Sequence, residues 1–409
     1  MTKIQEYSDV SNRILYLADY CLTPHRKISH PGILCEDGKI LAFGGSSAFE
    51  KEPGLQVIEL PDTYATPGII DTHIHGAGGF DCTSSSACGD ITPMSVTLAS
   101  HGITSFLPTI VTASHEKMIL AISSLTKIIR ANHVLGAVPV GINVEGPFLN
   151  KEKHGSQYEQ EIRQIDIGEA REMIAEGKNM IRIMTFAPEL DNSIKLIEIL
   201  LENNIIPSMG HSLADEVSVL KAVDAGARRC THVYNGMPPL HHRTAGLTAI
   251  ALTDDRIHVE IILDGSHIHP KMVDLACRTK PKDKVVGISD AIQGTGMHDG
   301  IYHLGDSEIH IEKGKVTTAD GTLAGSTMTL ERGWRHLIAF THLENTEASA
   351  CLTYNPAKSI GLNDRGELRP GKTADITFFD SKTNTVRMTV CRGQIVYDSQ
   401  QGLNSSNNK

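Results

Sequence analysis

The central part of the chain alternates apolar runs with amphipathic segments, and this rhythm constrains the fold more than any other feature of the sequence. Eight runs have the length and composition of buried strands, and segments with helical periodicity lie between most of them. Such alternation is typical of a parallel sheet flanked by helices. The runs are residues 68–76, 103–111, 137–146, 181–189, 205–212, 228–236, 257–267 and 284–291. They predict an α/β fold, a (β/α)8 TIM-like barrel, which uses about 250 residues.

Both ends of the chain lack this rhythm and contain short β segments instead. Residues 1–64 include a hairpin signal around an Asp-Gly pair, and residues 367–400 contain two further strand candidates. Neither end could bury a core alone at this length. We therefore expect one small β domain built from both ends, a barrel of residues 65–366 and a polar tail at 401–409.

The composition narrows the classes of function. The chain of 409 residues has a formal net charge of −10, which argues against a surface for nucleic acid. No apolar run approaches the length of a membrane span, and the first ten residues lack the core of a signal peptide. The eight cysteines form no C-x-x-C pair, which fits reduced thiols. We expect a cytoplasmic protein that acts on a small molecule and binds neither nucleic acid nor a membrane.

Chemically active side chains end four of the predicted strands. Glu145 ends the third strand, His211 the fifth, His232 the sixth and Asp290 the eighth. In a (β/α)8 barrel these ends meet at one mouth, where catalytic groups lie. The intervals from Glu145 to His211 and from His232 to Asp290 are each close to two βα units of about 30 residues. Residues placed by chance would not keep this regular spacing in whole βα units.

A pair of histidines lies in the first predicted strand. His73 and His75 are two positions apart, so both side chains face the same side of a strand and could share a metal ion. The pair is weak support by itself, because His267 and His269 have the same spacing.

Histidines with a carboxylate suit a borderline divalent cation, zinc or iron first, with manganese and cobalt also accepted. Such a cation lowers the pKa of bound water and polarises a carbonyl. Asp290, if it faces the same water, could remove a proton and deliver it to a leaving nitrogen. We expect one or two divalent metal ions per chain.

With these residues assembled, the chain resembles the amidohydrolase superfamily, and within it the N-acetylglucosamine-6-phosphate deacetylases. The similar segments follow in order from about residue 65 to 380 and include PGIIDTHIHGAGG, VEGPFLN, THVYNGMPPLHHR and SDAIQGTGMHDGIYHLG. The resemblance implies a metal-dependent barrel, a small β-sandwich domain formed by both termini, and a homodimer.

The resemblance also implies roles for individual residues. Glu145, His211 and His232 correspond to the main metal ligands, and Asp290 to the catalytic acid-base. His73 and His75 match a pair that some members use for a second metal. The implied contacts with the sugar phosphate are Asn235, Gly236, Arg243, His267, Leu323, Ala324 and Gly325.

The chain departs from the family's pattern in the turn after GPFLN. The family usually has a histidine there that polarises the acetyl carbonyl, whereas this turn is Gly155-Ser156-Gln157. A glutamine amide can donate a hydrogen bond but cannot carry a proton. We expect Ser156 and Gln157 to contact the substrate. Asn143 and Gly236 also replace the residues usual in the family, His and Ala, and we expect these changes to lie around the substrate.

The predicted reaction is removal of the acetyl group from an N-acetylhexosamine 6-phosphate, with N-acetylglucosamine 6-phosphate first. One alternative keeps the chemistry and changes the substrate to the galactosamine epimer or to another amide, including an unphosphorylated one. The other alternative is a catalytically idle paralogue that binds a sugar phosphate. The complete ligand set and Asp290 argue against the idle paralogue, which has no physical need to keep them.

Overall fold

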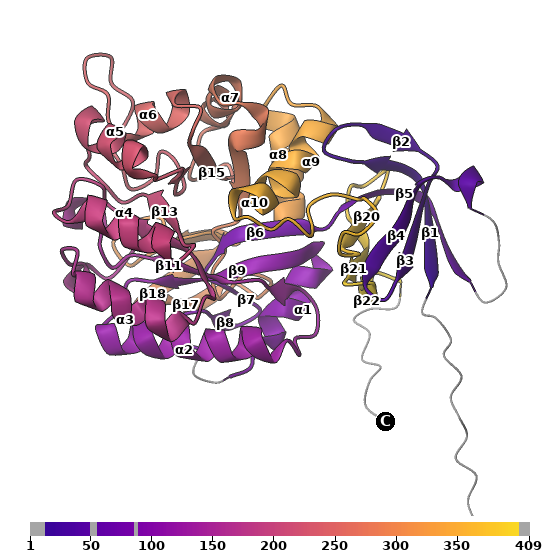
Figure 1. Cartoon of the computed structure of the whole chain (residues 1–409), viewed down its shortest axis with the longest axis horizontal. Helices are drawn as coiled ribbons and strands as arrows, with labels where there is room; N and C mark the ends of the chain where they lie inside the picture. The colour runs from indigo at the N-terminus through magenta and orange to yellow at the C-terminus, as the bar shows by residue number, and fades with distance from the viewer. Residues whose placement is uncertain (1–12, 50–54, 86–88, 401–409) are drawn as a thin grey trace, which may run out of the picture.

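The structure is a computed structural model, and it describes residues 13–49, 55–85 and 89–400. Its larger part is a barrel of parallel strands surrounded by helices (Figure 1). The predicted polar tail at 401–409 lies outside the described residues. Among those described, no helix is long and apolar enough to cross a membrane.

The barrel sheet contains all eight predicted strands. Its hydrogen-bonded order is β10-β9-β11-β12-β13-β14-β15-β16, and β6 pairs with β9. The strands are β6 (Ile69–Ile74), β9 (Ile103–Val111), β10 (Val138–Pro139), β11 (Ile142–Glu145), β12 (Ile181–Phe186), β13 (Ile206–Met209), β14 (Arg229–Cys230), β15 (His258–Ile262) and β16 (Val285–Ile288). The ring nearly closes between β16 and β6, where Asp290 N donates to His73 O at 3.0 Å and His75 N donates to Ala291 O at 2.8 Å.

Ten helices surround the described part of the barrel (Figure 1). They are α1 (Thr92–Ser100), α2 (His115–Ala131), α3 (Ile167–Gly177), α4 (Ser193–Glu202), α5 (Glu216–Ala225), α6 (Leu247–Thr253), α7 (Pro270–Thr279), α8 (Leu330–Phe340), α9 (Asn345–Leu352) and α10 (Tyr354–Ser359). The helix α2 shows how the sequence produces them. Ser114 caps its N-terminus by accepting from Lys117 N, and Met118, Ile122 and Leu125 bury one face against the core.

The two ends of the chain share one eight-stranded sheet. Its strands are β1 (Ile14–Leu22), β2 (Lys27–Ser29), β3 (Pro31–Glu36), β4 (Lys39–Gly45), β5 (Gln56–Pro67), β20 (Ile376–Asp380), β21 (Val386–Cys391) and β22 (Gln394–Asp398). The antiparallel pair β5 and β20 joins the ends, and Tyr16, Ile33 and Phe378 belong to a core of their own. The predicted fold class is confirmed. The domain limits stay a prediction, and β5 runs past the limit at 64/65 to Pro67.

A small antiparallel sheet follows the last barrel strand. It consists of β17 (Gly300–Leu304), β18 (Ser307–Glu312) and β19 (Lys315–Thr317), and a short pair, β7 (Gly76–Ala77) with β8 (Phe80–Asp81), follows β6. Leu304 at the end of β17 and Thr322 after β19 line the cavity at the barrel mouth. This excursion therefore provides part of the wall of the site.

Candidate metal centre and active site

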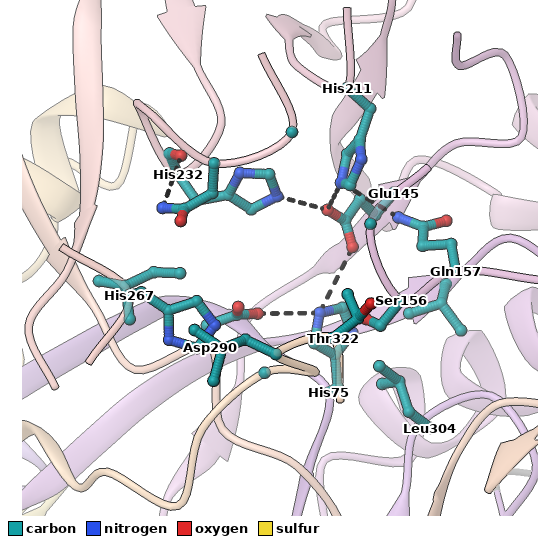
Figure 2. Close-up of a pocket in the computed structure, with 17 residues that line it drawn as sticks. His75, Glu145, Ser156, Gln157, His211, His232, His267, Asp290, Leu304 and Thr322 are labelled. Atoms are coloured by element: carbon teal, nitrogen blue, oxygen red, sulfur yellow. Dashed lines mark hydrogen bonds and ion pairs between the residues drawn. The ribbon is translucent and has the colours of Figure 1, made fainter. Parts of the chain in front are cut away.

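Four imidazoles surround one carboxylate, Glu145, which ends β11. Figure 2 shows three of them, those of His75, His211 and His232. The Oε1 atom of Glu145 lies 2.9 Å from His211 Nε2 and 2.8 Å from His232 Nε2. Its Oε2 atom lies 3.4 Å from His75 Nε2 and 3.6 Å from His73 Nε2. The structure thus brings together all five predicted ligands, in two groups that share Glu145. We call His211 and His232 the loop pair, and His73 and His75 the strand pair.

The tautomers of these imidazoles fit a bound cation. The Nδ1 atoms of His211 and His75 face the backbone carbonyls of Lys153 and Thr109, at 2.7 and 3.2 Å. A carbonyl only accepts, so in each ring Nδ1 carries the proton and a neutral ring presents a lone pair at Nε2. These Nε2 lone pairs point at carboxylate oxygens, which also carry lone pairs. A divalent cation between them would bind the lone pairs of both the imidazoles and the carboxylate.

The loop pair and Asp290 have unusual backbone conformations. His211, His232 and Asp290 have φ values of 49°, 26° and 51°. Positive φ is uncommon for residues other than glycine, and it costs about 1–3 kcal/mol at each position. Each of the three residues comes two residues after the end of a strand, so the left-handed turn directs its side chain into the barrel mouth.

Asp290 lies beside the strand pair. Its Oδ1 atom is 3.1 Å from His75 Nε2 and 3.5 Å from His73 Nε2. Burial by itself would raise the pKa of Asp290, but the imidazoles that face it, His75 first and then His73 and His232, lower the pKa below its usual value. The carboxylate is therefore ionised and able to accept a proton.

Glu145 is affected in the same way. Burial favours its protonated form, yet the surrounding histidines, His73 first, hold the pKa of Glu145 well below its usual range. The carboxylate is thus kept in the charged form that a cation requires.

Gln157 lies on the opposite side of Glu145 from Asp290 (Figure 2). Its Oε1 atom accepts a hydrogen bond from Thr112 N at 3.0 Å, and its Nε2 atom lies 3.4 Å from His211 Nε2. Because a backbone N–H only donates, Thr112 decides which way the amide is turned. The NH2 group therefore faces His211, a predicted metal ligand, and Gln157 presents hydrogen-bond donors to the cavity.

The cavity has a volume of about 260 Å³ and contains most of the predicted contact residues. The predicted residues that line it are His75, Glu145, Ser156, Gln157, His211, His232, Asn235, Gly236, His267, Asp290, Leu323 and Gly325. Three others do not line it: His73 and Ala324 are fully buried behind the wall, and Arg243 is exposed in the loop before α6.

His267 contributes an imidazole to the cavity wall. Asp264 Oδ2 accepts from its Nδ1 atom at 2.8 Å. Burial would lower the pKa of His267, but the hydrogen bond with Asp264 raises it above the ordinary value. An imidazole with a raised pKa at this place suits an anionic part of a substrate.

The two further departures from the family pattern are explained differently. Gly236 has a φ of 62°, and a Cβ atom on it would lie 2.9 Å from His211 Nδ1. Glycine therefore permits this loop to approach the ring of His211 closely. Asn143 lies fully buried in β11, where its Nδ2 atom donates to Thr72 O at 3.2 Å, and it does not line the cavity. The expectation that Asn143 lies around the substrate is wrong: Asn143 is on the same inward side of β11 as Glu145, but it comes two residues earlier and therefore lies deeper in the barrel.

Sequence reasoning missed part of the site. Val111, Ile262, Leu304 and Thr322 also line the cavity, and no local pattern marks them as wall residues. Glu260 was missed too, although a charged residue in the middle of the apolar run HVEII is a signal that could have found it.

Comparisons with known proteins agree with this geometry. The model of the amidohydrolase family matches residues 64–396. N-acetylglucosamine-6-phosphate deacetylase from Bacillus subtilis is 35% identical, covering 95% of this chain and 98% of the relative. N-acetylgalactosamine-6-phosphate deacetylase from Escherichia coli O157:H7 is 32% identical, covering 92% and 99%.

A solved structure is similar over nearly its whole length. It is a variant of N-acetyl-D-glucosamine-6-phosphate deacetylase from Mycobacterium smegmatis in complex with N-acetyl-D-glucosamine 6-phosphate. It is 30% identical with a TM-score of 0.86, and the match covers 94% of this chain and 99% of that one. The shared fold, the His and Glu cluster and the length of these matches lead to one conclusion: the chain belongs to the N-acetylglucosamine-6-phosphate deacetylase family of amidohydrolases.

Proposed function

We propose that this protein hydrolyses the acetamido group of an N-acetylhexosamine 6-phosphate to acetate and the amino sugar phosphate, with N-acetylglucosamine 6-phosphate as the first candidate. The observation that carries the proposal is the arrangement of Glu145, the loop pair and Asp290 around one cavity. Relatives named as N-acetylglucosamine-6-phosphate deacetylases match 94–95% of the chain.

The metal would be held by Glu145, His211 and His232, with His73 and His75 available for a second ion. We expect zinc or iron, with manganese or cobalt as alternatives. When bound, the metal supplies activated water and polarises the acetyl carbonyl.

The residues of the chain divide the remaining work. Asp290, ionised beside His75, accepts the proton of the attacking water at a carboxylate oxygen and passes it to the amine nitrogen that leaves. Gln157 donates from its amide to the acetyl oxygen as charge develops there. His267, charged beside Asp264, attracts the phosphate, and Asn235 with Gly236 and Leu323 bounds the sugar.

The role of Arg243 stays a prediction. Its exposed position means that it does not belong to the cavity of its own chain, and a homodimer in which the neighbouring chain supplies this loop is our expectation. A cytoplasmic location is likewise expected from the reduced cysteines.

The test is acetate release from three substrates by the zinc-loaded and the iron-loaded protein. The substrates are N-acetylglucosamine 6-phosphate, its galactosamine epimer and unphosphorylated N-acetylglucosamine. We expect release from the first at the highest kcat/KM and no measurable release from the third. Protein stripped of metal by a chelator is the control. The absence of acetate from both phosphorylated substrates would refute the proposal and support the idle paralogue.

The galactosamine epimer is the second candidate. It is favoured by the 32% identity to the N-acetylgalactosamine-6-phosphate deacetylase over 92% of this chain. A higher kcat/KM for the epimer than for the glucosamine compound would exchange the order of the two candidates.

A further inference from the structure

A buried ion pair lies beneath the histidines of the site. Arg229 on β14 and Glu260 on β15 are each 1% exposed, and Glu260 Oε1 lies 2.7 Å from Arg229 Nη2 and 2.9 Å from Arg229 Nε. Replacing a buried ion pair by apolar residues of similar size is often neutral or stabilising. Branched apolar side chains usually fill the inside of such a barrel. Stability therefore does not explain why this pair is here.

The second oxygen of Glu260 contacts both pairs of histidines. Its Oε2 atom lies 2.9 Å from His73 Nδ1 and accepts a hydrogen bond from His232 N at 3.2 Å. The contact with His73 is to a side chain, whereas that with His232 is only to the backbone. Glu260 can therefore set the orientation of the His73 ring but not that of the His232 ring.

His73 needs such a partner because, among the described residues, Glu260 is the only hydrogen-bond partner of its Nδ1 atom. It is fully buried, and its Nε2 atom lies 3.2 Å from His75 Nε2 and 3.6 Å from Glu145 Oε2. An imidazole that donates Nδ1–H to a carboxylate presents the lone pair of Nε2 to a metal, and the carboxylate makes it a stronger ligand.

Arg229 holds Glu260 in this position. Besides its two contacts with Glu260, its guanidinium donates to Thr72 Oγ1 at 2.6 Å and to Ser359 Oγ at 2.5 Å. These contacts join β6, β14 and β15 with α10. With Oε1 of Glu260 held by Arg229, the carboxylate can only present Oε2 to His73.

We propose that Glu260 is a positioning residue for the second metal ion. Held by Arg229, it keeps the proton of His73 on Nδ1 and directs Nε2 to the place shared with His75 and Glu145. The inference rests on the proposed metal-dependent function but concerns metal binding, not turnover. It implies that Glu260 determines the affinity for the ion at the strand pair and leaves the ion at the loop pair nearly unchanged.

The test uses the variant Glu260→Asp in the full-length protein. Aspartate keeps the negative charge beside Arg229 but withdraws the carboxylate from His73 by one methylene group. Zinc affinities are measured by competition with a chelator of known affinity. We expect two zinc ions per wild-type chain, and in the variant a dissociation constant about 10–100-fold higher for one ion, with the other ion within about threefold. The double variant Glu260→Gln with Arg229→Met removes both charges, and it should lose the same ion.

The matched control is Glu331→Asp, which shortens another buried carboxylate that contacts an imidazole. Glu331 Oε1 lies 3.1 Å from His101 Nδ1, and neither residue lines the cavity. This control should bind both zinc ions as the wild type does. Equal weakening of both ions, unchanged affinities in Glu260→Asp, or a single zinc ion in the wild type would each overturn the inference. A failure of the proposed function can be distinguished from a failure of this inference. In the first case the zinc affinities would be as expected, but no acetate would be released.

Discussion

The strand pair and the loop pair hold their histidines in different ways, although both contact Glu145. His73 lies in β6 and His75 directly follows it, so the alternation of a strand places both rings on one side. His211 and His232 come after strand ends, with positive φ values. The strand pair thus costs little backbone strain, but its His73 depends on Glu260 from another strand. The loop pair carries the strain, and His211 is held by the nearby carbonyl of Lys153.

The largest expected effect comes from removing the carboxylate that both pairs share. In Glu145→Gln we expect metal to be lost from both pairs and kcat/KM to fall about 10⁴-fold, because a bound metal supplies several kcal/mol of transition-state stabilisation. Metal per chain and acetate release are measured together, with metal-stripped wild type as the reference. Retention of metal at one pair would break the view that Glu145 serves both equally.

A somewhat smaller effect is expected on the side of the strand pair. Asp290 contacts His73 and His75, and Asp290→Asn removes its ability to move a proton while keeping its size. We expect kcat to fall about 10³-fold with metal content unchanged. The matched control is Asp191→Asn, which changes an exposed acid on the loop before α4 and should keep full activity. A loss that appears only in KM would contradict the role in proton transfer.

On the side of the loop pair, the corresponding test is Gln157→Glu. Glutamate can still accept from Thr112 N, but it has no amide donors to offer the acetyl oxygen. We expect kcat to fall about 10²-fold. Gln293→Glu is the control, because Gln293 donates to Gly79 O outside the cavity. Wild-type kcat in Gln157→Glu would show that the acetyl oxygen needs no donor from this residue.

The smallest effect concerns a histidine that forms no ion pair with a carboxylate of the described residues. His258 starts β15, two residues before Glu260, and burial with the nearby charges of Lys284 and Arg229 lowers the pKa of His258 to about 3. The folded protein therefore keeps it neutral, whereas the unfolded chain takes up a proton below about pH 6.5. The unfolded state binds more protons between these values, so the free energy of unfolding falls as the pH falls through this window.

The free energy of unfolding of the wild type should fall between pH 6.5 and 5. We expect this fall to be about 1 kcal/mol smaller in His258→Gln. Urea unfolding of the wild type and the variant at both pH values measures this difference. Equal losses in the two proteins would mean that His258 is protonated in the folded state as well.

Much of this protein could be predicted from its sequence. The period of the apolar runs placed eight strands, and the structure has a strand in each. The positions of Glu145, His211, His232 and Asp290 at strand ends predicted that they meet, and they do. Such predictions succeed because parallel strands of a barrel direct their carboxyl ends to one mouth, so position along the chain translates directly into position in space.

Other parts of the site could not be predicted in this way. Leu304 and Thr322 reach the cavity only because a β excursion folds over the mouth, and the exposed position of Arg243 depends on the path of a loop. Loop paths are set by contacts with distant residues, which local patterns do not contain.

The sequence by itself determined the barrel and the predicted ligand set of this protein, since periodicity and strand ends are local properties. Only the tertiary structure decided that Glu260 lies against His73, that Thr112 turns the amide of Gln157 toward the ligands, and that Asn143 lies inside the barrel. These facts depend on hydrogen bonds between residues far apart in the chain. The direction in which each donor and acceptor points is fixed when the strands pack together, and not before.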